Sequence, residues 1–226
     1  MRIGGFQKLT LLDYPGEVAC IIFTAGCNFR CPYCHNSGLI KDKGGISEEE
    51  IMGYLKKRSG ILDGVVVTGG EPLMHKDIAE LITKIRSMGY KIKIDTNGSF
   101  PERLRSLVSM GLADYVAMDI KHVPELYRKA AGREVAAEVI DESVKILKAS
   151  GIRCEFRTTT VKGIHTEEDI EAIAMYLDTD IPYYLQQYKD SGMILAPEGL
   201  GDFSEEELDR MADRARKYCP NTSVRG

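Results

Sequence analysis

The sequence predicts an α/β fold in which outer helices cover a parallel sheet. Two observations lead to this fold class. Short apolar runs rich in β-branched residues recur along the chain, and the segments between them carry apolar residues spaced three and four apart. Continuously apolar strands are typical of parallel sheets, because helices bury both faces. A doubly wound sheet and a sheet curled into a barrel both fit this order. At 226 residues, a single domain over residues 1–226 is expected.

Six strands and several helices are predicted in alternation. The strands are expected at 18–24, 64–68, 91–95, 115–121, 153–161 and 183–187. Apolar residues at helical spacing predict helices near 78–85, 104–108 and 170–177. Two capping-box patterns mark helix starts and three glycines mark helix ends: Ser47 with Glu50, Thr166 with Asp169, and then Gly89, Gly111 and Gly151.

Polar residues follow the predicted strands at the end where parallel α/β proteins carry their reactive groups. These segments are the cysteine cluster at 27–34, then 68–72, 95–98, 119–122 and 187–189. Because the carboxyl ends of parallel strands meet at one edge of the sheet, we expect these polar groups to gather at one rim.

The charge balance and the distribution of apolar residues limit the classes of partner that the protein is expected to bind. The chain carries 30 Lys and Arg against 34 Asp and Glu, with the basic residues scattered, so no nucleic-acid footprint is expected. No apolar stretch approaches the roughly 20 residues of a membrane span, and the first residues do not resemble a signal peptide. We expect a cytoplasmic protein that acts on a small molecule or on another protein.

Three of the six cysteines, Cys27, Cys31 and Cys34, fall within eight residues. In a reducing compartment such a cluster favours metal or redox chemistry over disulfides. Zinc would also need His35, but Cys34 and His35 are adjacent and rarely both reach one small ion. A ferredoxin-type carrier supplies four thiolates to its cluster, and this motif supplies three.

The other cysteines offer no obvious fourth ligand. Cys20 is expected inside a strand as a small core residue, while Cys154 and Cys219 are distant in sequence and are expected to be free thiols. An iron-sulfur cluster with one iron open to another ligand is the remaining possibility.

The spacing Cys27-x-x-x-Cys31-x-x-Cys34, with Tyr33 before the third cysteine, resembles the signature of the radical S-adenosylmethionine (radical SAM) superfamily. The resemblance implies a partial (β/α)6 barrel and a 4Fe-4S cluster that is held by these three cysteines. It implies S-adenosylmethionine as the ligand of the fourth iron, and its reductive cleavage to a 5′-deoxyadenosyl radical.

The segment Gly69-Gly70-Glu71-Pro72 is similar to the family motif that lies along the methionine amino group. Two glycines let the backbone approach a ligand closely, and a carboxylate can accept a hydrogen bond from an ammonium. A turn between a strand and a helix explains the same four residues without a ligand.

Later loops resemble those of glycyl-radical activating enzymes. The resemblance places six more residues near the cofactor: Asp95, Thr96, Asp119, Lys121, Arg157 and Tyr188. It also implies a cation near Asp95 and Asp119. An Asx turn at 95–98 and surface salt bridges at the charged residues are the structural alternatives. Three histidines are expected at surface or loop positions without a catalytic role: His75, His122 and His165.

Two features narrow the branch of the superfamily. The ending Tyr33-Cys34-His35-Asn36 resembles activases of glycyl radical enzymes, and the opening at 5–16, GFQKLTLLDYPG, resembles activating proteins of anaerobic ribonucleoside-triphosphate reductases. The opening also fits an N-terminal hairpin or turn at Pro15-Gly16. The resemblance implies a partner reductase that receives a glycyl radical, and an electron donor such as flavodoxin or ferredoxin.

Other functions stay open. Pyruvate formate-lyase activation is the nearest alternative, and a radical SAM enzyme acting on a small molecule, such as a deazaguanine synthase, is more distant. A non-catalytic iron-sulfur or zinc module is the alternative from a different class. A protein that only carries electrons does not need to bind S-adenosylmethionine. The GGEP segment at 69–72 and the DTNG segment at 95–98, which resemble cofactor-binding motifs, therefore favour an enzyme.

Overall fold

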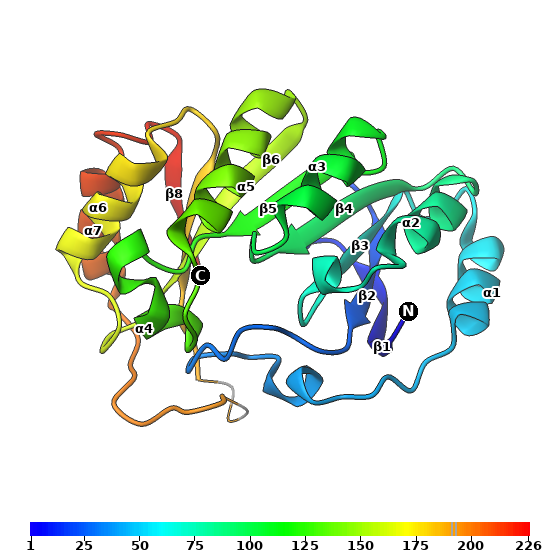
Figure 1. The fold of residues 1–226 in the computed structure, drawn as a ribbon, viewed down its shortest axis with the longest axis horizontal. Coiled ribbons are helices and arrows are strands. Elements are labelled where there is room, and N and C mark those ends of the chain that lie inside the picture. Colours follow the sequence, from blue (N-terminus) through cyan, green and yellow to red (C-terminus); the bar gives the residue numbers. More distant parts are fainter. Residues whose placement is uncertain (191, 193) are drawn as a thin grey trace. The chain divides into compact units, whose positions relative to one another are not determined.

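The computed structural model describes residues 1–190, 192 and 194–226. The chain forms two compact units. The first comprises residues 1–28, 38–96 and 100–117, and the second comprises residues 29–37, 97–99 and 118–226. The boundary passes through strand β5, Tyr115–Asp119 (Figure 1). The single domain expected from chain length stays a prediction.

The first unit is built on strands β1 (Ile3–Thr10), β2 (Ala19–Thr24), β3 (Gly64–Gly69) and β4 (Lys91–Thr96). β1 runs antiparallel to β2, whereas β2, β3 and β4 are parallel, and the strands lie in chain order. The helical elements are η1 (Ser37–Ile40), α1 (Glu48–Arg58), η2 (Pro72–Met74), α2 (Ile78–Arg86) and α3 (Pro101–Ser109). Each parallel strand therefore ends in a loop on the same side of the unit.

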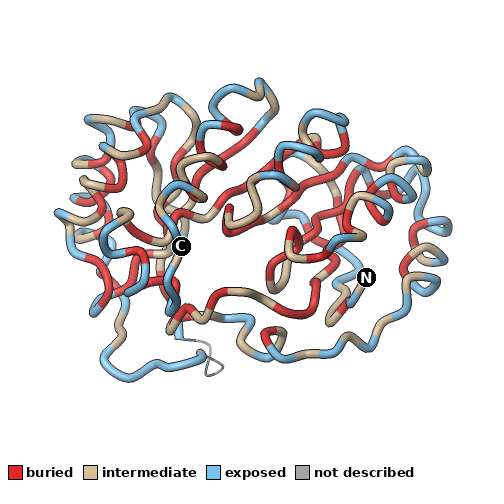
Figure 2. Tube along the Cα trace, viewed as in Figure 1, coloured by how far each residue is buried: buried red, intermediate tan, exposed pale blue. Residues whose placement is uncertain are grey.

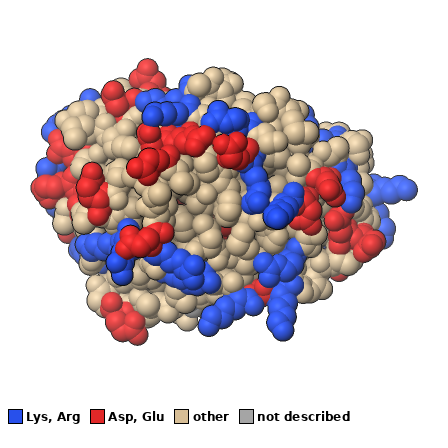
Figure 3. All heavy atoms as spheres, in the orientation of Figure 1, with Lys and Arg blue, Asp and Glu red and all other residues tan. Residues whose placement is uncertain are grey.

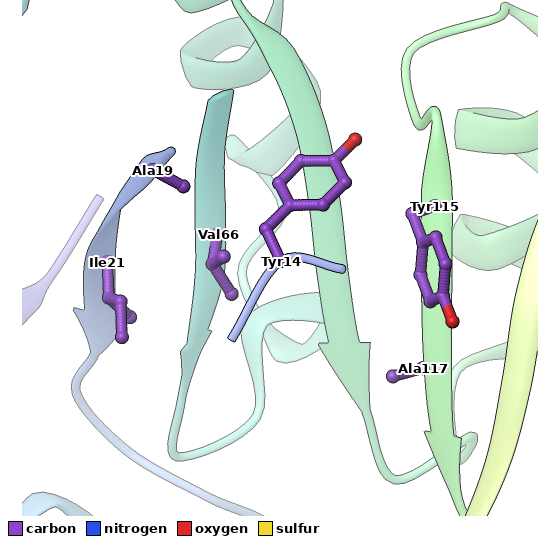
Figure 4. Close-up of a cluster of buried hydrophobic side chains, with 6 residues drawn as sticks. All are labelled: Tyr14, Ala19, Ile21, Val66, Tyr115 and Ala117. Carbon is purple, nitrogen blue, oxygen red and sulfur yellow. The ribbon is translucent and has the colours of Figure 1, made fainter. Parts of the chain in front are cut away.

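The core of this unit explains why its strands form. Val65, Val66 and Val67 in β3 are fully buried, and Figure 2 shows buried residues running along the strands. Tyr14, from the turn between β1 and β2, lies across the sheet and packs on residues of β2, β3 and β5 (Figure 4): Ala19, Ile21, Val66, Tyr115 and Ala117. The Tyr14 and Tyr115 rings meet edge to face, with centroids 6.1 Å apart. The opening of the sequence thus forms a hairpin whose turn packs the Tyr14 side chain against the sheet.

The second unit contains the parallel strands β6 (Arg153–Thr160), β7 (Tyr183–Gln187) and β8 (Thr222–Arg225). Its helical elements are η3 (Pro124–Leu126), α4 (Tyr127–Ala131), α5 (Ala137–Ser150), α6 (Glu167–Leu177) and α7 (Glu205–Ala215). Helices α6 and α7 pack against each other, as Figure 1 shows, and α7 also contacts β7 and β8. Ion pairs of Arg214 with Glu168 and Glu171, at 2.7 Å each, connect the two helices.

All six predicted strands are present, with ends that differ from the prediction by at most two residues. The structure adds two strands that the apolar pattern did not reveal, β1 and β8. The predicted helix caps are present: the Ser47 hydroxyl accepts from the Glu50 N–H at 3.1 Å, and Thr166 and Asp169 form a reciprocal capping box. Gly89, Gly111 and Gly151 adopt positive φ just after their helices.

Charges of both signs are interspersed over the face seen in Figure 3. Within the described part of the chain, no helix has the length and apolar character that a membrane span requires.

Candidate active site

The GGEP turn follows β3 in the first unit and lies directly against the residues that lead into Cys27. A β-carbon at Gly70 would lie 1.9 Å from the Gly26 carbonyl oxygen, and one at Gly69, which has φ +114°, would lie 2.4 Å from the Thr24 amide nitrogen. Two backbone hydrogen bonds, from Gly70 N–H to the Thr24 carbonyl and from Glu71 N–H to the Gly26 carbonyl, are each 2.9 Å. The two glycines are therefore required for close approach of two backbone segments of this chain. Binding of a ligand by them stays a prediction.

Glu71 is buried, with 1% of its surface exposed, and holds this turn from within. Its Oε1 accepts from the Leu73 N–H at 3.0 Å, which caps η2, and from the Thr96 hydroxyl at 2.8 Å. Pro72 occupies the first turn of η2, where its missing N–H costs nothing. The strand-to-helix turn considered for GGEP is thus present, and it brings Glu71 and Thr96 together.

His75 ties the same turn to the start of the cysteine segment. Its Nε2 lies 3.0 Å from the Ala25 carbonyl oxygen, and burial lowers its pKa. The Thr24 hydroxyl oxygen, at the end of β2, is fully buried and has no hydrogen-bond partner among the described residues. Hydrogen bonds from Gly70, Glu71 and His75 therefore hold the residues at the end of β2. The Thr24 hydroxyl in the same place is available to a further polar group.

Cys31 and Cys34 lie in the second unit, in a tight turn closed by a 3.1 Å hydrogen bond from the Cys34 N–H to the Cys31 carbonyl. Cys31 is buried and Cys34 is half-buried. Burial raises the pKa of Cys31 to about 11, although the charge of Lys121 opposes the rise. Burial also raises the pKa of Cys34, against the Asn36 N–H and Lys121. The metal-free thiols are consequently protonated at neutral pH, and a metal must displace their protons.

Asp119, Lys121 and Arg157 form one partly buried ion-pair network. Lys121 Nζ is 3.0 Å from Asp119 Oδ2, and Arg157 donates from Nη2 to Asp119 Oδ1 at 2.9 Å. Burial would raise the pKa of Asp119, but Arg157 and then Lys121 outweigh it and bring that pKa to about 2. Burial disfavours the Lys121 cation, whereas Asp119, Tyr33 and Cys31 raise its pKa well above the ordinary value. All three groups are therefore charged at neutral pH, and the network places a fixed cation among the thiols.

Tyr33 lies beside this network. Its ring is 5.9 Å from the Lys121 ammonium and meets the His165 ring edge to face at 6.5 Å. The side chain is 3% exposed, and its hydroxyl has no hydrogen-bond partner among the described residues. A buried hydroxyl is normally satisfied, so this atom is suited to a polar group that binds next to the cysteine turn.

The three histidines lie in loops, which agrees with the expectation of surface or loop positions, and all three are buried. His165 accepts from the Val161 N–H at Nδ1, 3.2 Å away, and its Nε2 is 2.9 Å from the Lys121 carbonyl oxygen. Burial lowers the pKa of His165 to about 4 and also lowers that of His122, which stacks on it at 5.1 Å. Both rings are neutral packing elements that support the loop after β5.

The loop after β4 contains the Asx turn considered for it, since Asn97 Oδ1 accepts from the Ser99 N–H at 3.0 Å. Asp95 forms an ion pair with Lys93, whose side chain is 3% exposed and was not anticipated from the sequence. The signal that could have found Lys93 is its alternation with Asp95 on one face of a strand. A cation near Asp95 and Asp119 stays a prediction. Among the described residues, no three His, Cys, Asp or Glu side chains are grouped as ligands of one metal ion.

Tyr188 follows β7 and is buried, with 2% exposed. Its ring lies 5.9 Å from the ring of His35, the residue after Cys34, at an interplanar angle of 45°. The structure therefore brings Tyr188 next to the cysteine turn, and its contact with the cofactor stays a prediction.

The chemistry of the donor set suits an iron-sulfur cluster. Among the described residues none of the six cysteines forms a disulfide, and thiolates are the usual cluster ligands. Two of the buried polar atoms without a partner among the described residues, on Thr24 and Tyr33, belong to the segment that carries the cysteine motif. A cation, Lys121, opposes the negative charge that the Cys31 and Cys34 thiolates would bring.

Comparison with known proteins agrees with this chemistry. A protein of Methanocaldococcus jannaschii provisionally named as a glycyl-radical enzyme activating enzyme is 35% identical over 99% of this chain and 95% of its own length. A second protein of that organism with the same provisional description is 26% identical over 96% of this chain and 80% of its own.

Among solved structures, Streptococcus suis SuiB bound to the precursor peptide SuiA has a TM-score of 0.69 at 16% identity, over 91% of this chain and 48% of that one. It shares the fold, an α/β architecture with a mostly parallel sheet. The family model of the radical SAM superfamily matches residues 21–177. On the motif, the fold and this match, the chain belongs to the radical SAM superfamily, whose enzymes use a 4Fe-4S cluster and S-adenosylmethionine.

Proposed function

We propose that this radical SAM enzyme is an activase that generates a glycyl radical on a partner anaerobic ribonucleoside-triphosphate reductase. The observation that carries the proposal is the similarity, over nearly the full length of both chains, to a protein provisionally named as a glycyl-radical enzyme activating enzyme. The YCHN ending of the motif and the LTLLDYPG opening favour the reductase as the partner. The proposal includes cytoplasmic location and a flavodoxin or ferredoxin as electron donor.

In this proposal Cys27, Cys31 and Cys34 hold the cluster as thiolates. Bound together, the cluster and S-adenosylmethionine supply the one-electron chemistry that removes a hydrogen atom from a glycine of the partner. Lys121 stabilises the Cys31 and Cys34 thiolates by charge, and its ammonium is held in place because it donates a hydrogen bond to Asp119 Oδ2 at 3.0 Å. Asp119 therefore orients a cation beside the cluster while keeping its own carboxylate ionised.

The proposal includes eleven residues as contacts of S-adenosylmethionine. Gly69, Gly70, Glu71, Pro72, Asp95 and Thr96 belong to the first unit, and Tyr33, Asp119, Lys121, Arg157 and Tyr188 belong to the second. Glu71 is a buried carboxylate that can accept from an ammonium, and the Tyr33 hydroxyl is a buried donor that has no hydrogen-bond partner within the described part of the chain. These two groups are the ones whose chemistry most supports a polar, zwitterionic cofactor.

The decisive experiment combines two measurements on anaerobically reconstituted protein. The reduced protein and S-adenosylmethionine are mixed with an anaerobic ribonucleoside-triphosphate reductase, and the glycyl radical is recorded by electron paramagnetic resonance while 5′-deoxyadenosine is quantified. A radical signal together with deoxyadenosine is expected. Pyruvate formate-lyase is tested in parallel, and a signal there alone would replace the proposed partner.

Two further results would contradict the proposed formation of a glycyl radical. Deoxyadenosine without a radical on either protein would favour a small-molecule substrate. An intact cofactor would favour an electron carrier or a zinc module.

A further inference from the structure

The segment between Cys27 and Cys31 is held by a second segment of the second unit, residues 127–132. The Arg30 N–H donates to the Ala131 carbonyl at 2.9 Å. The Phe29 ring meets the Tyr127 ring edge to face, with centroids 6.3 Å apart, and both side chains are at most 4% exposed. These contacts fix the backbone one and two residues before Cys31.

Gly132 provides the closest of these contacts. It ends α4 in the left-handed region at φ 66° and ψ 13°. A β-carbon at this position would lie 2.0 Å from the Arg30 carbonyl oxygen and 2.6 Å from its carbonyl carbon. Both atoms belong to the backbone, so a side chain at residue 132 could be accommodated only by moving the cysteine loop or α4.

The other side of Cys31 is also fixed, because the Ala196 N–H donates to the Pro32 carbonyl at 2.9 Å. Cys31 therefore lies between two anchored backbone positions, Arg30 and Pro32. A ligand loop that is ordered before binding loses less conformational entropy when the metal group arrives, and supporting contacts of this kind tune the affinity of a metal site.

We propose that residues 127–132 are a clamp that sets the conformation of the cysteine loop before the cluster binds, and that Gly132 is the positioning residue of this clamp. The inference rests on the proposed function in one respect, since it takes Cys31 as a cluster ligand. Its statement about the metal-free loop depends on the contacts of Phe29, Arg30 and Gly132 alone.

The chain supplies a matched control for Gly132. Gly151 ends α5 with nearly the same conformation, φ 68° and ψ 1°, but a β-carbon there would meet no atom within 4 Å. Gly132→Ala and Gly151→Ala therefore carry the same left-handed strain, and only Gly132→Ala adds the collision with Arg30. The difference between the two variants isolates the clamp.

The first measurement is iron retention. Wild type and both variants are reconstituted with iron and sulfide, and iron loss to a chelator is followed by absorbance. We expect retention to weaken about 10- to 100-fold in Gly132→Ala, the usual range for residues that support metal ligands, and to stay at the wild-type level in Gly151→Ala. Equal retention in all three proteins, or equal loss in both variants, overturns the clamp.

The second measurement uses metal-free protein and hydrogen exchange. The Arg30 amide should be protected in wild type and in Gly151→Ala, and should exchange several-fold faster in Gly132→Ala. Free exchange in the wild type overturns the proposal whatever the cluster does. If Gly132→Ala does not fold by circular dichroism, Tyr127→Leu takes its place, and unchanged protection of Arg30 in that variant is the contrary result.

These outcomes are separable from those of the proposed function. Iron loss in Gly132→Ala without any glycyl radical on the tested reductases leaves the clamp intact and removes only the partner. If the wild type binds no cluster, the exchange measurement alone decides the clamp.

Discussion

The structural role of Glu71 and its proposed role in ligand binding can be separated by substitution. Its Oε1 accepts two hydrogen bonds, from Leu73 and Thr96, in a fully buried setting. Glu71→Ala leaves both donors unsatisfied and should lower the free energy of unfolding by about 1–3 kcal/mol, whereas Glu71→Gln keeps an acceptor and should cost less. Urea unfolding of the metal-free variants measures this.

Binding of S-adenosylmethionine to reconstituted Glu71→Gln gives the second half of the test. Weaker binding without loss of stability would show that the negative charge serves the cofactor. Unchanged binding would confine Glu71 to its capping role.

His165 should make stability depend on pH. Burial lowers its folded pKa to about 4, against the Lys121 carbonyl, while neighbouring Asp169 raises the pKa and His122 and Lys129 lower it. In the unfolded chain the imidazole has a pKa near 6.5. Below this pH the unfolded state therefore binds a proton that the native state does not bind. Stability should therefore fall as pH drops from about 6.5 to 4, by at most ~3 kcal/mol from this residue.

The measurement is the urea midpoint between pH 7 and 5, where carboxylates are ionised in both states. His165→Gln should show a shallower decline than wild type over this range. Burial also lowers the pKa of His35, His75 and His122, and these rings contribute to the decline that is left. Parallel curves for the two proteins would contradict the assignment of the pH dependence to His165.

Individual residues were also where sequence reasoning was weakest. His122 and His165 lie in loops, where no helical or strand periodicity of apolar residues marks the buried positions. The sequence therefore does not distinguish these buried rings from exposed ones. The paired glycines of GGEP are predicted to let the backbone approach a ligand, which stays a prediction, and in the structure they lie against this chain's own Thr24–Gly26 segment. Glycines in the sequence indicate that another group lies close to the backbone but do not identify that group.

At the scale of elements, the turn between β1 and β2 combines an anchor with an exposed tip. Tyr14 is 1% exposed within the core cluster, whereas Leu12, two residues earlier, is 90% exposed. Tyr14→Ala should lower the free energy of unfolding by about 3–5 kcal/mol, as for other large-to-small changes in a core. Leu12→Ala should change it by no more than about 0.5 kcal/mol.

Chemical denaturation of both variants, at equal protein concentration, is the measurement. If Tyr14→Ala and Leu12→Ala lowered the free energy of unfolding by similar amounts, Tyr14 would not anchor the turn in the core as the structure describes.

The elements found from sequence and those that were missed differ in burial. The strands β2, β3, β4 and β5 are mostly buried and read as apolar runs, so their bounds were predicted closely. β1 contains two glycines and three exposed residues, and β8 has only four residues, of which one is buried. Their strand structure depends on pairing with a neighbour, which local composition does not report.

For the whole molecule, removal of iron should lower thermal stability. A group that binds only the folded chain stabilises it by mass action, so reconstituted protein should melt above metal-free protein. Cys27→Ala, Cys31→Ala and Cys34→Ala should each lose this increment together with cleavage of S-adenosylmethionine. Cys20→Ala should keep both, although its buried site in β2 will cost some stability. Full activity of any motif variant would overturn the ligand assignment.

The family was predictable from the sequence because its motif is local, with three cysteines and Tyr33 within eight residues. The reaction partner was not, because recognition of another protein depends on surfaces that no short motif encodes. The clamp at residues 127–132 was missed for a similar reason, since Gly132 is 102 residues from Arg30 and only the fold brings them together.

The unequal burial of the cysteines has a consequence for handling the purified protein. Cys20, Cys154 and Cys219 are buried, and burial raises the pKa of Cys20 to about 12 and that of Cys154 to about 11. Thiolate and access both govern alkylation and air oxidation, so these three should be inert in the native state. Cys27 and Cys34 are half-buried and would be modified first. A preparation that has lost its cluster in air would thus be damaged selectively at the motif, while a total thiol assay after unfolding would still detect these three buried thiols.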